Sequence, residues 1–157
     1  MKPSTFTATV EWRRGDAKFT DKRYSRAHAW RFDGGAVVPG SSSPLSVPLP
    51  FSDEQAVDPE EAFVAALSSC HMLFFIASVA RDGYLLDSYD DAAIGTMEKN
   101  ARGKFAMSRV TLRPRLVFSG DRQPSAEQVA ALHHWAHEEC YLANSVTTEV
   151  VIEPQQE

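Results

Sequence analysis

The segment from Asp58 to Gly83 constrains the fold most, because it has the pattern of a long helix that is apolar on nearly every side. Asp58 can cap its start, Pro59 suits the first helical position and Glu61 completes a capping box. Apolar residues recur at three- and four-residue spacing along one stripe: Phe63, Ala66, Leu67, Cys70, Leu73, Phe74 and Ala77. We expect this helix to be buried nearly all round, with the rest of the chain packed around it.

Strand patterns occupy the residues before the helix, 1–57. Phe6, Ala8, Val10 and Trp12 alternate with polar residues, which predicts a half-buried strand. A second alternating run places five side chains on one face: Tyr24, Arg26, His28, Trp30 and Phe32. A hairpin turn at residues 33–35 leads to a short strand around 36–38, and the serine- and proline-rich residues 39–57 predict an irregular loop.

Strand patterns return after the helix, over residues 90–118, with a turn at 100–103 and a proline, Pro114, that predicts an edge or a bulge. A second helix is expected over 125–140, since Ser125 and Gln128 form a capping box, and a last strand over 146–153. Residues 1–157 therefore predict a single α+β domain without a regular βαβ order.

Composition excludes several classes of protein. With 157 residues, of which 43% are hydrophobic, the chain can bury a sizeable core. A formal net charge of -5 gives no basic field for nucleic acid or anionic lipid. The N-terminus lacks the apolar region of a secretory signal, and we expect no run of the roughly 20 apolar residues that span a bilayer. We therefore expect a cytoplasmic protein, in which a bond between two cysteines would be transient.

The chain has two cysteines, Cys70 in the first predicted helix and Cys140 at the end of the second. One interpretation is a thiolate that attacks and a second thiol that resolves the product. The other is a pair of unconnected core cysteines, because free cysteine is among the most buried residue types.

Other side chains allow alternative sites. His133, His137 and Cys140 share a helical face at a spacing that Zn²⁺ could use, but a fourth ligand is not evident. A hydrolytic pair of Cys70 with His28 or His71 is a further alternative. His71 is a poor base for its neighbour, because adjacent helical residues point about 100° apart.

Two segments carry a resemblance to a known family. Asp58 to Met72, DPEEAFVAALSSCHM, and His137 to Val150, HEECYLANSVTTEV, resemble the two cysteine motifs of the osmotically inducible protein C family, which includes the organic hydroperoxide resistance proteins. The match includes the Pro-Glu start, the cysteine ten residues after Glu60 and the Asn-Ser-Val that follows the second cysteine. The resemblance implies an intertwined homodimer, with antiparallel sheets wrapped around central helices, and a peroxidase that reduces organic hydroperoxides.

The resemblance also implies roles for individual residues. Cys70 matches the peroxidatic nucleophile, Cys140 the resolving cysteine, and Glu60 the glutamate that pairs with a catalytic arginine. The N-terminal third diverges from the family, so Arg14, Arg23 and Arg26 are all candidates for that arginine. Arg26 is favoured because its strand face also carries His28 and aromatic residues. The side chains expected to line the substrate pocket are His28, Trp30, Phe63 and Phe74.

These roles are chemically consistent. A thiol among apolar side chains needs a nearby cation to act as a thiolate, and a buried Arg26 needs Glu60 as a counter-charge. Since Glu60 and Cys70 are roughly 15 Å apart along one helix, we expect sites shared between the two subunits of a dimer. We expect no cofactor and an external dithiol as reductant. The alternative function is non-catalytic binding of a small apolar ligand in the same pocket.

Overall fold

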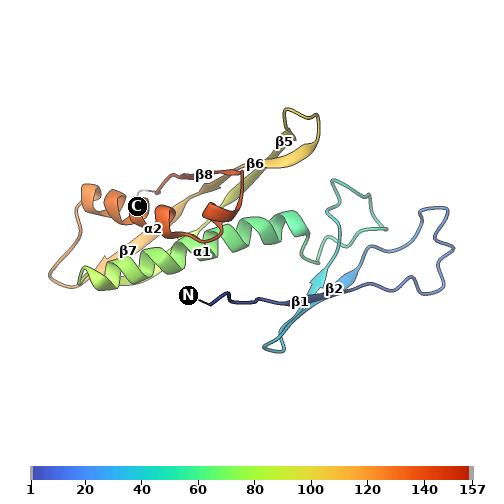
Figure 1. The fold of residues 1–157 in the computed structure, drawn as a ribbon, viewed down its shortest axis with the longest axis horizontal. Coiled ribbons are helices and arrows are strands. Elements are labelled where there is room, and N and C mark those ends of the chain that lie inside the picture. Colours follow the sequence, from blue (N-terminus) through green and yellow to red (C-terminus); the bar gives the residue numbers. More distant parts are fainter. Residues whose placement is uncertain (1, 156–157) are drawn as a thin grey trace. The chain divides into compact units, whose positions relative to one another are not determined.

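The computed structural model describes residues 2–155, which divide into two compact units, the first ending at Ala62 and the second beginning at Phe63. The order of elements is three strands, a long helix, four strands, a second helix and a last strand. This order confirms the predicted α+β class (Figure 1).

The first unit is built on a three-stranded antiparallel sheet of β1 (Ala8–Glu11), β2 (His28–Phe32) and β3 (Val37–Gly40), in that order. Arg26 precedes β2, so the expectation that it lies within this strand is wrong. The backbone N–H of Arg26 bonds to the Phe51 carbonyl instead of to a neighbouring strand. The first strand is not half-buried in one chain either, since Phe6 is 92% exposed and Val10 is 66% exposed.

Residues 41–57 form the predicted irregular loop, which is tied down by a few polar contacts. The hydroxyl of Ser41, which is fully buried, accepts a hydrogen bond from the Asp53 backbone at 2.9 Å. Gly40 and Val57 form an isolated bridge, so the two ends of the loop lie side by side. The loop therefore ends directly before the long helix.

Helix α1 spans Pro59–Arg81, close to the predicted 58–83. Asp58 Oδ1 accepts from the Glu61 backbone at 2.8 Å, and the Asp58 N–H donates to Glu61 at 3.2 Å, which confirms the capping box. Gly83 follows with a φ of 78°, a conformation that favours glycine. The sequence places the start of this helix correctly because its capping chemistry is local.

The buried face of α1 differs from the predicted stripe. It consists of Leu67, His71, Phe75, Ser78 and Val79. Leu73 is 61% exposed and Ile76 is 40% exposed, so the helix is not buried all round within one chain. Apolar spacing could not identify the covered face, because nearly every face of this helix is apolar.

The second unit contains two sheets. Strands β4 (Leu85–Asp91) and β7 (Pro114–Ser119) form an antiparallel pair. Strands β5 (Ile94–Lys99) and β6 (Phe105–Leu112) form a hairpin, and β8 (Glu149–Ile152) pairs parallel to β6. The predicted range 90–118 omits most of β4. Pro114, predicted to mark an edge or a bulge, begins β7, and the chain is divided there between β6 and β7 because proline cannot donate to the ladder.

Helix α2 spans Ala126–Glu139, and Ser125 and Gln128 form the predicted capping box. Cys140 is its C-cap, and a short 3₁₀ turn follows at Ala143–Ser145. The second cysteine thus lies where the helix ends and the chain turns toward β8.

Two apolar clusters hold the second unit together along α1. Phe75 and Val79 pack with Leu132 and Ala136 of α2, against side chains of β4 and β7. Leu67 packs with Val110 and Leu112 of β6, against side chains of β8 and against Ala93 and Val146, which precede β5 and β8. Cys70 thus lies in sequence between the parts of α1 that belong to the two clusters.

By length and composition alone, α1 could cross a membrane, with a mean hydropathy of 1.9 in its most apolar window. The expectation that no apolar run is long enough is therefore wrong. A helix at the core of a globular protein meets the same criterion. The buried face of α1 includes His71 and Ser78, and it packs on the strands and on α2.

Candidate active site

The structure brings the two cysteines together. Cys70 lies in α1 and is half-buried, whereas Cys140 caps α2 and is 2% exposed. The two thiols lie close enough for Cys70 to raise the pKa of Cys140, and both thiols are free. The sequence left open whether the two cysteines are redox partners or separate core residues, and the structure brings their thiols close to each other.

The environment of Cys140 keeps its thiol protonated. Burial, followed by the nearby Cys70 thiol, raises the pKa of the Cys140 thiol to about 11. The backbone N–H of Ala143 donates to Cys140 Sγ at 3.4 Å and partly opposes this effect. A thiol of this kind has little thiolate at neutral pH, so it suits a resolving role better than a first attack.

Aromatic side chains border the two cysteines. Phe74 lies one helical turn after Cys70, and its ring meets Tyr141, the neighbour of Cys140, edge-on at 5.0 Å. Phe63 lies two turns before Cys70 on the same side of α1 and is half-buried. The predicted pocket residues Phe63 and Phe74 thus flank the thiol, and Tyr141 is a further aromatic residue that the sequence analysis missed.

A pair of buried histidines lies next to the cysteines. His71 Nε2 and His133 Nδ1 are 3.0 Å apart, and the two rings are nearly parallel. The His133 ring also stacks on Phe75 at 4.1 Å. The sequence suggested His71 only as a possible base for Cys70. In the structure its partner is the imidazole of His133 on the other helix.

Both histidines are neutral at physiological pH. Burial lowers the pKa of His71 to about 4 and that of His133 to about 3. The charge of His137 adds to the effect on His71, and Asp91 opposes it. The outer nitrogens, His71 Nδ1 and His133 Nε2, have no protein partner within the described residues.

A second polar group ties α1 to the strands. The hydroxyl of Ser68 donates to Asp91 Oδ2, and Asp91 Oδ1 accepts the backbone N–H of Arg113 at 2.6 Å. The nearby Tyr89 hydroxyl is buried without a partner among residues 2–155, and burial raises the pKa of Tyr89. Asp91 thus anchors the N-terminal half of α1, while the histidine pair anchors its middle.

Arg26 belongs to the first unit, where its guanidinium is held locally. It donates to the carbonyl oxygens of Lys22 and Tyr24 at 2.9 and 2.6 Å, and it stacks on the Tyr24 ring at 3.8 Å. No ion pair joins Arg26 to Glu60 within the described part of one chain. The role of Arg26 toward the Cys70 thiol stays a prediction, as does that of Glu60.

The other two arginines that the sequence left open also have local partners. Arg14 donates to the Ala17 carbonyl at 2.7 Å. Arg23 lies over the Phe51 ring at 5.8 Å. Arg26 is the one of the three that is half-buried, as a cation that serves a thiolate in an apolar pocket must be.

His28 and Trp30 share one face of β2, as expected. Their rings lie 6.1 Å apart, and His28 Nδ1 is 2.7 Å from the Arg26 carbonyl oxygen. Both rings cover Gly40 of β3, where an added Cβ would lie 2.5 Å from His28 Nε2. Gly40 is therefore required for this close packing.

The metal alternative does not fit the geometry. His133 Nδ1 faces His71, and no group of three histidine, cysteine or acidic side chains is arranged to hold a metal ion among residues 2–155. His133, His137 and Cys140 share one side of α2 without converging on a common point.

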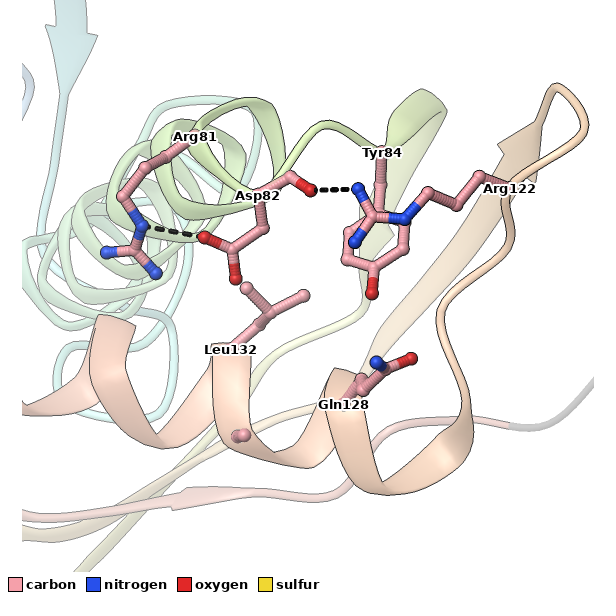
Figure 2. A pocket seen from close by; sticks show the side chains of 7 residues that line it. Arg81, Asp82, Tyr84, Arg122, Gln128 and Leu132 are labelled. Atoms are coloured by element: carbon pink, nitrogen blue, oxygen red, sulfur yellow. Dashed lines mark hydrogen bonds and ion pairs between the residues drawn. The ribbon is translucent and has the colours of Figure 1, made fainter.

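A pocket of about 350 Å³ lies away from the cysteines, between the end of α1 and the start of α2 (Figure 2). Its guanidinium groups already have structural roles. Arg122 donates to the Asp82 carbonyl at 2.6 Å and stacks on Tyr84, so it caps the C-terminus of α1. Arg81 pairs with Asp82 at 2.7 Å. We therefore place the candidate site at the cysteines.

Comparison with known proteins connects this geometry to a family. A family model described as OsmC-like protein matches residues 52–155. An OsmC-like protein of unknown function from Vibrio cholerae is 53% identical, with a TM-score of 0.96 over 98% of this chain and 100% of that chain. No curated protein matches the sequence.

More distant structures share the fold. An organic hydroperoxide resistance protein from Elizabethkingia anophelis is 17% identical, with a TM-score of 0.74 over the whole of both chains. One from Bacillus subtilis is 20% identical, with a TM-score of 0.68 over 96% of this chain and 98% of that chain. At these identities the likeness shows the fold alone.

Proposed function

Because the chain belongs to the OsmC-like protein family, we propose that it is a thiol-dependent peroxidase that reduces organic hydroperoxides and protects against oxidative stress. The observation that carries the proposal is the proximity of two free thiols, since the Cys70 thiol raises the pKa of Cys140. The names of the Elizabethkingia and Bacillus proteins, which concern organic hydroperoxide resistance, agree with it.

The proposed cycle begins at Cys70. Its thiolate attacks one peroxide oxygen, the O–O bond breaks, an alcohol leaves and Cys70 becomes a sulfenic acid. Cys140 then attacks this sulfur, which releases water and forms the disulfide. An external dithiol restores both thiols, and no cofactor takes part. The less buried Cys70 meets the peroxide first, while Cys140 stays protonated until it reacts with the sulfenic acid.

The pocket chemistry favours bulky apolar substrates. Phe63 and Phe74 flank Cys70 on α1, and we propose that His28 and Trp30 complete the pocket in the assembled protein. Each buried methylene of a substrate adds about 0.8 kcal/mol to binding. Activity should therefore rise with substrate hydrophobicity and be lower with hydrogen peroxide.

We propose a homodimer that is assembled on α1. Leu73 and Ile76 leave an apolar face of this helix in solvent within one chain, and an antiparallel second copy would cover it. The same arrangement would place Glu60 of one subunit near Cys70 of the other. Glu60 and Arg26, which do not pair within one chain, could then act together at a composite site.

Turnover tests the proposal. With a dithiol reductant, wild-type protein should consume cumene or tert-butyl hydroperoxide faster than hydrogen peroxide, and Cys70→Ser should be inactive. Faster consumption of hydrogen peroxide would contradict the substrate class. Binding of these compounds without consumption would favour the alternative of a non-catalytic ligand-binding protein. A cytoplasmic location, in which dithiol reductants are abundant, is part of the same proposal.

A further inference from the structure

Among residues 2–155, one side-chain hydrogen bond joins the two helices that carry the cysteines, besides aromatic and cation–π contacts of Trp135 with Phe74 and Arg81. Most of the packing between α1 and α2 is apolar, with Phe75 and Val79 against Leu132 and Ala136. Within the described residues, the bond between His71 Nε2 and His133 Nδ1, at 3.0 Å, is the one side-chain hydrogen bond between the bodies of these helices. His71 is 1% exposed and His133 is 4% exposed, so solvent does not compete for this bond.

Stability alone does not account for the pair. Each imidazole leaves its outer nitrogen buried without a protein partner among residues 2–155, and an unpaired buried polar group is destabilising. Two leucines of similar volume would fill the same space without this cost. What a buried polar pair adds to an apolar contact is a defined register, because apolar surfaces can slide and rotate against one another with little change in energy.

The positions of the two histidines connect this register to the thiols. His71 follows Cys70 directly, so the rotation of α1 that fixes one side chain also fixes the other. His133 lies seven residues before Cys140, which is close to two helical turns, so both project from the same side of α2. A change in the rotation or sliding of either helix would therefore move the two sulfur atoms relative to each other.

We propose that the hydrogen bond between His71 and His133 is a positioning device that sets how readily Cys70 and Cys140 form a disulfide. The inference deepens the proposed peroxidase function and rests on it for its role in turnover. In the step concerned, Cys140 Sγ attacks the sulfenic sulfur of Cys70. The S–S bond forms, the S–OH bond breaks, and the thiol proton leaves with the hydroxide as water. His71 and His133 contact neither substrate nor sulfur in this account and act through the helices.

The test measures disulfide formation without peroxide. Reduced protein is equilibrated with oxidised and reduced glutathione, so that two protein thiols and one glutathione disulfide exchange for one protein disulfide and two glutathione thiols. The amide nitrogen of glutamine can occupy the place of His71 Nε2, whereas that of asparagine is one bond short. His71→Gln should therefore keep the equilibrium constant within about threefold of wild type, and His71→Asn should lower it by at least tenfold.

At His133, the hydrogen-bond partner of His71, the effects of asparagine and glutamine on the equilibrium constant should be reversed. The asparagine amide matches the place of His133 Nδ1, so His133→Asn should resemble wild type and His133→Gln should lose at least tenfold. His134, which is exposed on the same helix, provides the control, and His134→Gln should change nothing. Thermal unfolding is measured in parallel. If the pair were merely structural, the variants would change the melting temperature, but the equilibrium constant would not depend on which amide stands at each position.

Each outcome decides the matter. Equilibrium constants within twofold of wild type for His71→Asn and His133→Gln would overturn the proposal, as would equal losses for both amides at each site. If the Asn variant at position 71 or the Gln variant at position 133 does not fold, the other amide at that position still provides a test. That other variant is predicted to keep an equilibrium constant close to that of wild type. The glutathione equilibrium is independent of peroxide, so failure of the peroxidase proposal appears separately, as a wild-type protein whose thiols survive organic hydroperoxide.

Discussion

The Cys70 thiol lies close enough to Cys140 to raise the pKa of that thiol, and the two thiols come from different helices. Cys140 is almost fully buried, and Cys70 is only half-buried. The pair therefore has one member that a reagent can reach and one that is protected. This asymmetry matches a division of labour between attack and resolution.

The asymmetry predicts an order of thiol modification. At pH 7.5, iodoacetamide should label Cys70 well before Cys140, because Cys140 is buried and its pKa is raised to about 11. Peptide mass spectrometry at successive times gives the two rates. A native protein in which Cys140 is labelled as fast as Cys70 would contradict the described environment, and labelling in urea provides the control for intrinsic reactivity.

The histidine pair predicts a pH dependence of stability. Burial lowers the pKa of His71 from 6.5 to about 4, so between these values the unfolded chain binds more protons than the folded one. Burial lowers the pKa of His133 further, to about 3, so the free energy of unfolding should rise with pH from about 3 to 6.5 and then level off. His137 and Asp91 face His71 and contribute with opposite signs. Because a tenfold change in proton affinity corresponds to about 1.36 kcal/mol, His71 alone accounts for at most roughly 3.4 kcal/mol.

Urea unfolding at several pH values measures this slope. The double variant His71→Gln with His133→Asn removes both titrating groups and should flatten the curve, while His134→Gln should leave it unchanged. A slope that persists in the double variant would assign the pH dependence to other groups.

The cap of α2 predicts a contrast between two small residues. Ser125 accepts the N–H of Gln128, and its own N–H donates to the Gln128 side chain. Ser125→Ala should lower the free energy of unfolding by about 1 kcal/mol, whereas Ser125→Gly should cost only a few tenths. Urea denaturation gives both values. Equal losses for the two variants would indicate that the capping bond contributes little.

The proposed composite site predicts complementation between subunits. If Glu60 of one subunit serves Cys70 of the other, exchange of Cys70→Ser subunits with Glu60→Ala subunits should restore about one working site per heterodimer. Peroxide turnover before and after subunit exchange measures the recovery. A stable active monomer, or heterodimers without recovery, would contradict a shared site.

Local chemistry makes much of the fold predictable from sequence. The capping boxes at Asp58 and Ser125 determine the start of both helices. The buried face of α1 is not predictable, since a helix that is apolar all round gives no periodic signal. The break before Pro114 depends on which sheet each half joins, which is a tertiary property.

The candidate site is predictable only in part. The cysteine motifs identify Cys70 and Cys140, but their proximity depends on how α1 and α2 pack. The histidine run at the end of α2 has a metal-ligand pattern, whereas His133 turns to His71 on a helix far away in sequence. Alternation assigns Arg26 to β2, but this residue lies before the strand because its backbone bonds to Phe51 in the loop.

Oxidation by one equivalent of organic hydroperoxide tests the central claim most directly. Reduced protein is mixed with cumene hydroperoxide, free thiols are counted, and peptides are examined by mass spectrometry without reduction. We predict the loss of both thiols and one bond between Cys70 and Cys140 within a single chain. Cys140→Ser should react once and then proceed to sulfinic acid, and Cys70→Ser should not react. Two thiols that remain titratable after excess hydroperoxide would contradict the account.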